Sequence, residues 1–225
     1  MELNEVKQAI QKWDSVRNSA EQALSYLNQG ACVIINRQQF EVWNQNAPSE
    51  LHAYIGIFGE ELKFIFVDSE SSKDIAANTD RIFAQPYLPS LDILDGNFID
   101  NAVNGSITVM DALKRIMRWN TTMDAWVSNQ VNTEAGLFKA FIIPFSNLVS
   151  HFAEAGVEES MFVFGLNGDA ADLMLWGVTM APKAKHMEGR MRTTAFAAAQ
   201  SRDGVPVEDF TSPVPPFRPN EMTLF

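Results

Sequence analysis

Two short glycine pairs are the features of the sequence that most resemble a ligand-binding motif. The stretch GIFG occupies residues 56–59, and GLNG occupies residues 165–168. A loop that cradles phosphate places converging backbone N–H groups at the start of a helix. Here Glu60 and Glu61 follow the first pair and Asp169 follows the second, and acidic side chains repel phosphate. We therefore interpret both stretches as β-hairpin turns, in which the second glycine adopts a positive φ.

Cys32 is the single cysteine of the chain and its candidate for a thiolate nucleophile. Catalysis by a thiolate usually needs an adjacent base, and the chain has three histidines, His52, His151 and His186. The sequence places none of them beside Cys32, and the apolar run around Cys32 favours a buried core cysteine. These four residues also lack the spacing of a zinc site. We predict no catalytic residue, no metal site and no cofactor.

The densest group of oxygen ligands lies in the stretch LDILDGNFIDNAVNG at residues 91–105. It contains Asp92, Asp95, Asn97, Asp100 and Asn101. A calcium loop of the EF-hand type needs acidic residues two positions apart and a glutamate at its twelfth position. The first two aspartates are three positions apart and that glutamate is absent. We interpret the stretch as a polar, turn-rich linker.

Trp13 and Trp119 occupy equivalent places in the two longest amphipathic segments. This pairing favours a shared structural role, the packing of a helix on a sheet, and leaves stacking against a ligand as the alternative.

The composition limits the classes of function. The chain has 225 residues, 46% of them hydrophobic, so it can bury a substantial core. Its formal net charge is −11, which disfavours nucleic acid and anionic membranes as partners. The first residues lack the apolar segment of a secretory signal peptide, and no stretch approaches the ~18 apolar residues of a membrane span. With one cysteine, these features predict a cytoplasmic protein.

Hydrophobic spacing predicts an α+β fold with two long amphipathic helices. The first helix covers residues 3–29, and Gly30 ends it. The second begins at Thr108, which with Asp111 resembles a capping box. Further helices are predicted at 36–46, where a hairpin turn is the alternative, and at 146–155. Strands are predicted at residues 31–35, 52–58, 62–68, 138–143, 160–166 and 172–178.

The order of these elements repeats along the chain. Trp13 and Trp119 lie 106 positions apart, the pairs Ile34-Ile35 and Ile142-Ile143 lie 108 apart, and the glycine pairs lie 109 apart. We therefore predict two tandem αβαββ-like units with antiparallel hairpins packed on the long helices. The predicted boundaries are 1–68 for the first unit, 69–107 for a linker with little regular structure, 108–178 for the second unit and 179–225 for a C-terminal extension.

The extension begins with a basic patch and ends in a proline-rich tail. The patch consists of Lys183, Lys185, His186, Arg190 and Arg192, and the tail reads PVPPFRP at residues 213–219. This composition favours an extended, polyproline-like path. Either the tail drapes over the body and buries Phe210 and Phe217, or it is a peptide that binds a partner.

The aligned halves resemble a group of uncharacterised bacterial proteins. The resemblance rests on four stretches: Ile116 to Trp119, Ile143-Pro144, FVFGL at 162–166, and PVPP at 213–216. Val214 stands where the group often has a cysteine. The resemblance implies no activity, cofactor or site residue.

Our leading hypothesis from the sequence is a non-enzymatic interaction or structural protein that has a protein partner or self-associates. The first alternative is a small-molecule-binding or sensory module with its site between the two units. An enzyme is the third hypothesis.

Overall fold

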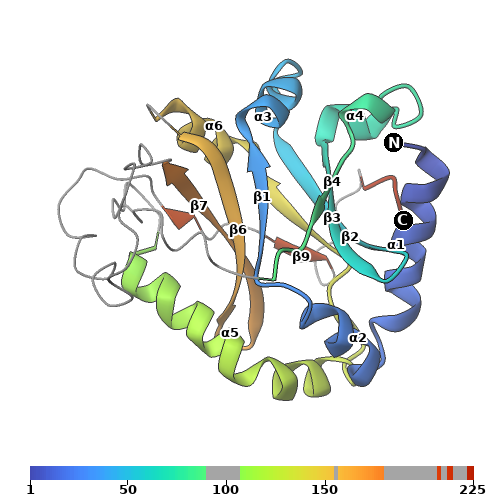
Figure 1. Ribbon diagram of the computed structural model, residues 1–225, viewed down its shortest axis with the longest axis vertical. Coiled ribbons are helices and arrows are strands. Elements are labelled where there is room, and N and C mark those ends of the chain that lie inside the picture. Colours follow the sequence, from blue (N-terminus) through green and yellow to red (C-terminus); the bar gives the residue numbers. More distant parts are fainter. Residues whose placement is uncertain (90–106, 155–156, 180–206, 209–211, 215–221) are drawn as a thin grey trace, which may run out of the picture.

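In the computed structural model, the protein is an α+β structure with two antiparallel sheets (Figure 1). The structure describes residues 1–89, 107–154, 157–179, 207–208, 212–214 and 222–225. The helices are α1 (Leu3–Val16), α2 (Ala20–Leu27), α3 (Arg37–Asn44), α4 (Ser69–Lys73), α5 (Val109–Gln130) and α6 (Phe145–Ala153), with a 3-10 turn at Thr79–Arg81. The strands are β1 (Cys32–Asn36), β2 (Glu50–Phe58), β3 (Glu61–Asp68), β4 (Phe83–Pro86), β5 (Ala140–Pro144), β6 (Val157–Asn167), β7 (Ala170–Thr179), β8 (Val207–Glu208) and β9 (Ser212–Val214).

Each sheet combines strands from both halves of the chain. One sheet, which we call sheet A, has the strand order β1-β6-β7-β8, and the other, sheet B, has the order β4-β3-β2-β5-β9. The first strand of each half therefore pairs with the hairpin of the other half. The sheets do not follow the predicted unit boundaries, although the tandem-unit hypothesis itself stays a prediction.

The two exchanged strands pair in the same register. Ile35 of β1 lies opposite Ser160 of β6. Ile143 of β5 lies opposite Leu51 of β2. These pairs keep the spacings of 108 and 109 residues that were read from the sequence.

Short segments close the corners between the two sheets. β4 pairs with β3 in sheet B, and Leu88, two residues after it, forms an isolated bridge with Cys32 in sheet A. On the other side, β8 pairs with β7 in sheet A and β9 pairs with β5 in sheet B. The hydrogen bond from Ala31 N to Leu88 O is matched by one from Lys139 N to Val214 O.

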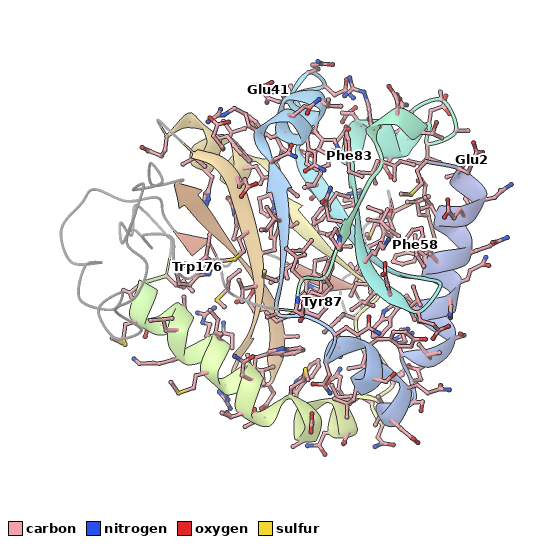
Figure 2. All side chains as sticks on the ribbon, in the orientation of Figure 1. Glu2, Glu41, Phe58, Phe83, Tyr87 and Trp176 are labelled. Carbon is pink, nitrogen blue, oxygen red and sulfur yellow. The ribbon has the colours of Figure 1, made fainter. Side chains whose placement is uncertain are left out.

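The core lies between the two sheets and is built largely of aromatic rings. Phe66 of β3 stacks on Phe162 of β6 with 5.5 Å between centroids, and Phe64 lies 5.8 Å from Phe164. Figure 2 shows Tyr87 between the sheets, where its ring contacts Phe64 and Phe164. Helix α1 packs on β2 and α5 packs on β6, so each sheet has a long helix on its outer face (Figure 1).

The prediction of one helix over residues 3–29 is wrong. The helix ends at Val16 and a second one begins at Ala20, with Ser19 extended at φ −109° and ψ 116°. Asn18 and Ser19 lie at the break, and both residue types have low helix propensity because their side chains compete with the backbone for hydrogen bonds. The break also lets the two pieces contact different neighbours, since α1 packs on β2 while α2 packs on α5.

The predicted helix starts are confirmed at atomic detail. Asn36 caps α3 in a complete capping box with Gln39, which excludes the alternative hairpin turn there. Thr108 caps α5 and accepts a hydrogen bond from Asp111 N at 3.1 Å. The short helix predicted at 146–155 spans Phe145–Ala153.

The stretch 69–107 is more ordered than the predicted linker in the part that the structure describes. It contains α4, the 3-10 turn at Thr79–Arg81 and strand β4 before residue 90. Helix α4 begins because Asp68 caps it, and β4 forms because the edge of β3 offers unpaired backbone groups.

Candidate functional site

The glycine pairs are structural, as the turn interpretation predicted. Gly59 has φ +61° and Gly168 has φ +62°, and each lies in the turn of a hairpin. The first glycine of each pair has a different role. A Cβ at Gly56 would lie 3.1 Å from the Cβ of Ala9, and one at Gly165 would lie 2.9 Å from that of Arg115. These glycines allow α1 and α5 to approach their strands closely.

The structure does not bring Cys32 together with His52. Cys32 is fully buried in the apolar cluster on the outer face of sheet A. His52 lies on β2, in the other sheet, with its ring 6.3 Å from that of Tyr54. Burial raises the pKa of the Cys32 thiol from 9.0 to about 11, so the thiol stays protonated at neutral pH. His151 is buried on α6, and His186 lies outside the described residues.

Two further candidates, the tryptophans, have packing roles, and the remaining candidates lie outside the described residues. Trp13 is buried and donates from Nε1 to the carbonyl oxygen of Phe138 at 2.9 Å. Trp119 stacks on Phe164 with 4.6 Å between centroids, so the packing role of both tryptophans is confirmed. The acidic stretch at 91–105 and the basic patch at 183–192 lie outside the described residues. Within the described part, no group of three or more His, Cys, Asp or Glu side chains could hold a metal ion.

Residues 222–225 occupy a distinct site on the body of the protein. They lie on the outer face of sheet B, and Figure 1 shows the C-terminus beside α1. We call this the terminal-peptide site and define it by Tyr54, Ser72, Lys139 and the apolar cluster under α1. That cluster includes Val6, Ile10, Ile65, Val67, Ile75 and Ile82.

Thr223 makes the polar contact of the site. Its hydroxyl donates to the carbonyl oxygen of Ser72 at 2.8 Å, and the two hydroxyl oxygens lie 3.1 Å apart. The Tyr54 hydroxyl lies beside Ser72, Leu224 and Thr223, and burial raises the pKa of Tyr54 to about 12.

Leu224 and Phe225 make the apolar contacts. Leu224 is 2% exposed and belongs to the cluster under α1. The Phe225 ring packs on the Tyr54 ring with 5.2 Å between centroids at 68°, and Lys139 Nζ lies 5.5 Å from the Phe225 centroid. Phe225 remains 53% exposed. The site therefore holds one residue deeply and the last residue only on one side.

Asp68 fixes the position of the helix that carries Ser72. Its Oδ1 accepts hydrogen bonds from Ser71 N at 2.9 Å and Glu70 N at 3.1 Å, and its Oδ2 accepts from the Ser71 hydroxyl at 2.5 Å. Asn46 donates to the same hydroxyl at 3.1 Å. These bonds satisfy the free N–H groups at the start of α4 and keep its backbone in place.

A charged cluster positions Lys139 next to the site. Lys139 Nζ lies 2.8 Å from Asp14 Oδ1, which also accepts from Arg17 Nε at 2.7 Å. Arg17 is nearly buried and donates further to the carbonyl oxygens of Ala135 and Leu137. Burial alone would raise the pKa of Asp14, but the hydrogen bonds and charges of Arg17 and Lys139 outweigh it and lower that pKa.

Sequence reasoning missed this site. Asp68 is the last residue of a predicted strand and three of the next four residues are serines, which is a helix-capping pattern that could have located α4. No local pattern indicates that the apolar end of the chain returns to Tyr54. Stacked rings lie between the two predicted units, including Phe40 on Phe152 with 4.6 Å between centroids, and a small-molecule site there stays a prediction.

No known protein family, curated protein or solved structure matches the chain. The fold is an α+β arrangement of two facing sheets, and Leu224 packs in the apolar cluster under α1. Among the described residues, no helix is long and apolar enough to cross a membrane.

Proposed function

We propose that the protein is a non-enzymatic interaction protein that binds an extended segment of a protein partner at the terminal-peptide site. One observation carries this proposal. The body holds residues 223–225 through side-chain contacts with three receptors, which are Ser72, the cluster under α1 and the ring of Tyr54. A surface that receives a peptide of its own chain has the shape and polarity to receive a similar peptide from another protein.

We also propose that the protein works in the cytoplasm and that its two halves derive from one duplicated unit. The duplication is supported by the matched registers of β1 on β6 and β5 on β2. The two corners between the sheets give further support. At one corner β4 pairs with β3 of sheet B and Leu88 pairs with Cys32 of sheet A. At the other, β8 pairs with β7 of sheet A and β9 pairs with β5 of sheet B.

Peptide binding to a shortened chain tests the proposed function. A chain that ends at residue 221 has an empty site, and a fluorescent peptide with the sequence of residues 216–225 is titrated into it while anisotropy is measured. We expect saturable binding to the shortened chain and binding at least ~10-fold weaker to the full chain, because the tethered terminus competes at a high effective concentration.

A pair of tyrosine variants provides the matched control. Tyr54→Phe removes the hydroxyl beside Thr223, while Tyr26→Phe removes a hydroxyl that donates to Glu60 at the hairpin tip. The first is expected to weaken peptide binding and the second to leave it unchanged. A shortened chain with an intact circular dichroism spectrum that binds no peptide would overturn the proposed function.

A further inference from the structure

We infer that the terminal-peptide site is selective for a segment of the type hydroxyl–aliphatic–aromatic, and that a partner with such a segment displaces the chain's own residues 222–225. This inference rests on the proposed function and specifies its ligand. The partner is a protein with an extended segment that resembles Thr-Leu-Phe.

Each of the last three residues has a receptor of matching chemistry. The Thr223 hydroxyl is matched by a carbonyl oxygen and a hydroxyl of Ser72. Leu224 enters an apolar cluster that is closed over by α1. The Phe225 ring contacts an aromatic ring and an ammonium group, both of which favour an aromatic side chain over an aliphatic one.

Leu224 shares its apolar cluster with Val214 of β9, but residues 222–225 make no backbone pairing with a described strand. Strand β8 pairs with β7 of sheet A and β9 pairs with β5 of sheet B, just as β4 pairs with β3 of sheet B and Leu88 with Cys32 of sheet A. Residues 222–225 follow β9 in the chain and belong to none of these pairs. They can therefore leave the site while every described strand keeps its partner.

The resident peptide is held by a single buried side chain. Leu224 is 2% exposed, whereas Thr223 is exposed and Phe225 is 53% exposed. A short contact of this kind opens at low free energy compared with the core. A partner that reproduces the three residues and adds contacts of its own competes with it effectively.

A peptide panel measured against the chain ending at residue 221 tests the selectivity. The parent peptide has the sequence of residues 216–225, and its variants carry Thr223→Val, Leu224→Ser or Phe225→Ala. We expect a loss of about 5-fold for Thr223→Val, as for one hydrogen bond. We expect about 30-fold for Leu224→Ser, as for loss of a buried aliphatic side chain. Equal affinities across the panel would overturn the inference while leaving the proposed function standing.

The full chain tests the displacement. In the full-length Leu224→Ser variant the resident peptide is weakened but the backbone is complete, so this variant should bind the parent peptide at least ~10-fold more tightly than the natural chain does. Equal affinities of the two chains would contradict displacement. Light scattering tests whether a second copy of this chain occupies the site. A dimer of the natural chain that becomes monomeric with Leu224→Ser would assign the site to a second copy of this chain and overturn the inference.

Discussion

The ring of Phe225 packs against the ring of Tyr54 with 5.2 Å between their centroids, so the last residue of the chain rests on a strand of its first half. This contact completes the outer face of sheet B beside α1, where Leu224 is buried.

Removing the Leu224 anchor should lower the stability of the whole protein. Burial of a leucine side chain contributes roughly 1.5–3 kcal/mol, so we expect Leu224→Ser to lower the free energy of unfolding by about 2 kcal/mol. Val149→Ser is the matched control, because Val149 is 42% exposed on α6, and it should change the free energy by less than about 0.5 kcal/mol. Urea denaturation measures both variants, and equal midpoints would show that the terminal residues are not docked in solution.

The two glycines of the first pair should respond differently to substitution. Gly56→Ala places a methyl group against Ala9 and Ile65, and such overpacking costs about 1–3 kcal/mol. Gly59→Ala meets open space but requires a positive φ, which costs about 1 kcal/mol. Asparagine tolerates positive φ, so Gly59→Asn should recover most of that loss while Gly56→Asn should not. Thermal unfolding measures the series, and a rescue at Gly56 would contradict the packing role.

Cys32 should be unreactive in the folded protein and should make stability depend on alkaline pH. Its pKa is about 11 when folded and 9.0 when exposed, so folding favours the protonated thiol. The resulting stabilisation is complete below pH 9 and is lost as the pH rises toward and through 11. We expect no labelling by a thiol reagent at pH 8 until denaturant is added. Cys32→Ala should show a smaller fall in stability between pH 8 and 10.5, and rapid labelling of the native protein would contradict the burial.

Asp14 should make stability depend on acid pH in the opposite sense. Its folded pKa lies below the usual value, so its contribution is present above the unfolded pKa and is lost as the pH falls through the folded pKa. Asp14→Asn leaves Arg17 nearly buried without its carboxylate, and we expect a loss of about 1 kcal/mol at pH 7. The difference from the natural chain should shrink in acid. Urea titrations at pH 7 and pH 3 measure it, and a constant difference would rule out the ion pair as its cause.

Neither half of the chain should fold alone. The exchanged pairing leaves β1 without β6 in a fragment of residues 1–89, and β5 without β2 in a fragment of residues 107–225. We expect each fragment to lack cooperative unfolding and the mixed fragments to recover the native circular dichroism spectrum. Cooperative unfolding of either fragment alone would show that the halves are independent domains.

The sequence predicted the individual helices and strands better than it predicted which of them pack or pair with each other. Caps at Asn36 and Thr108 and turns at Gly59 and Gly168 depend on a few adjacent residues, so their chemistry is local and readable. The break at residues 17–19 was missed because a hydrophobic stripe shows which face is buried and does not show a change of packing partner.

The exchange of strands and the terminal-peptide site depend on contacts between distant residues. Phe141 and Ile143 of β5 lie on one face of the strand and in the main core, and this face would be buried equally well beside β2 or beside β6. The meeting of Thr223 with Ser72 likewise leaves no local pattern, because neither residue is unusual in its own stretch.

Strand β9 also determines when, during synthesis of the protein, the outer edge of β5 becomes covered. The outer edge of β5 is covered by residues 212–214, which leave the ribosome long after β5 itself. Until then that edge presents unpaired backbone groups to other chains. A chain that stalls or terminates early therefore carries an open, largely apolar strand edge, and such prematurely ended chains are the form of this protein most prone to aggregate.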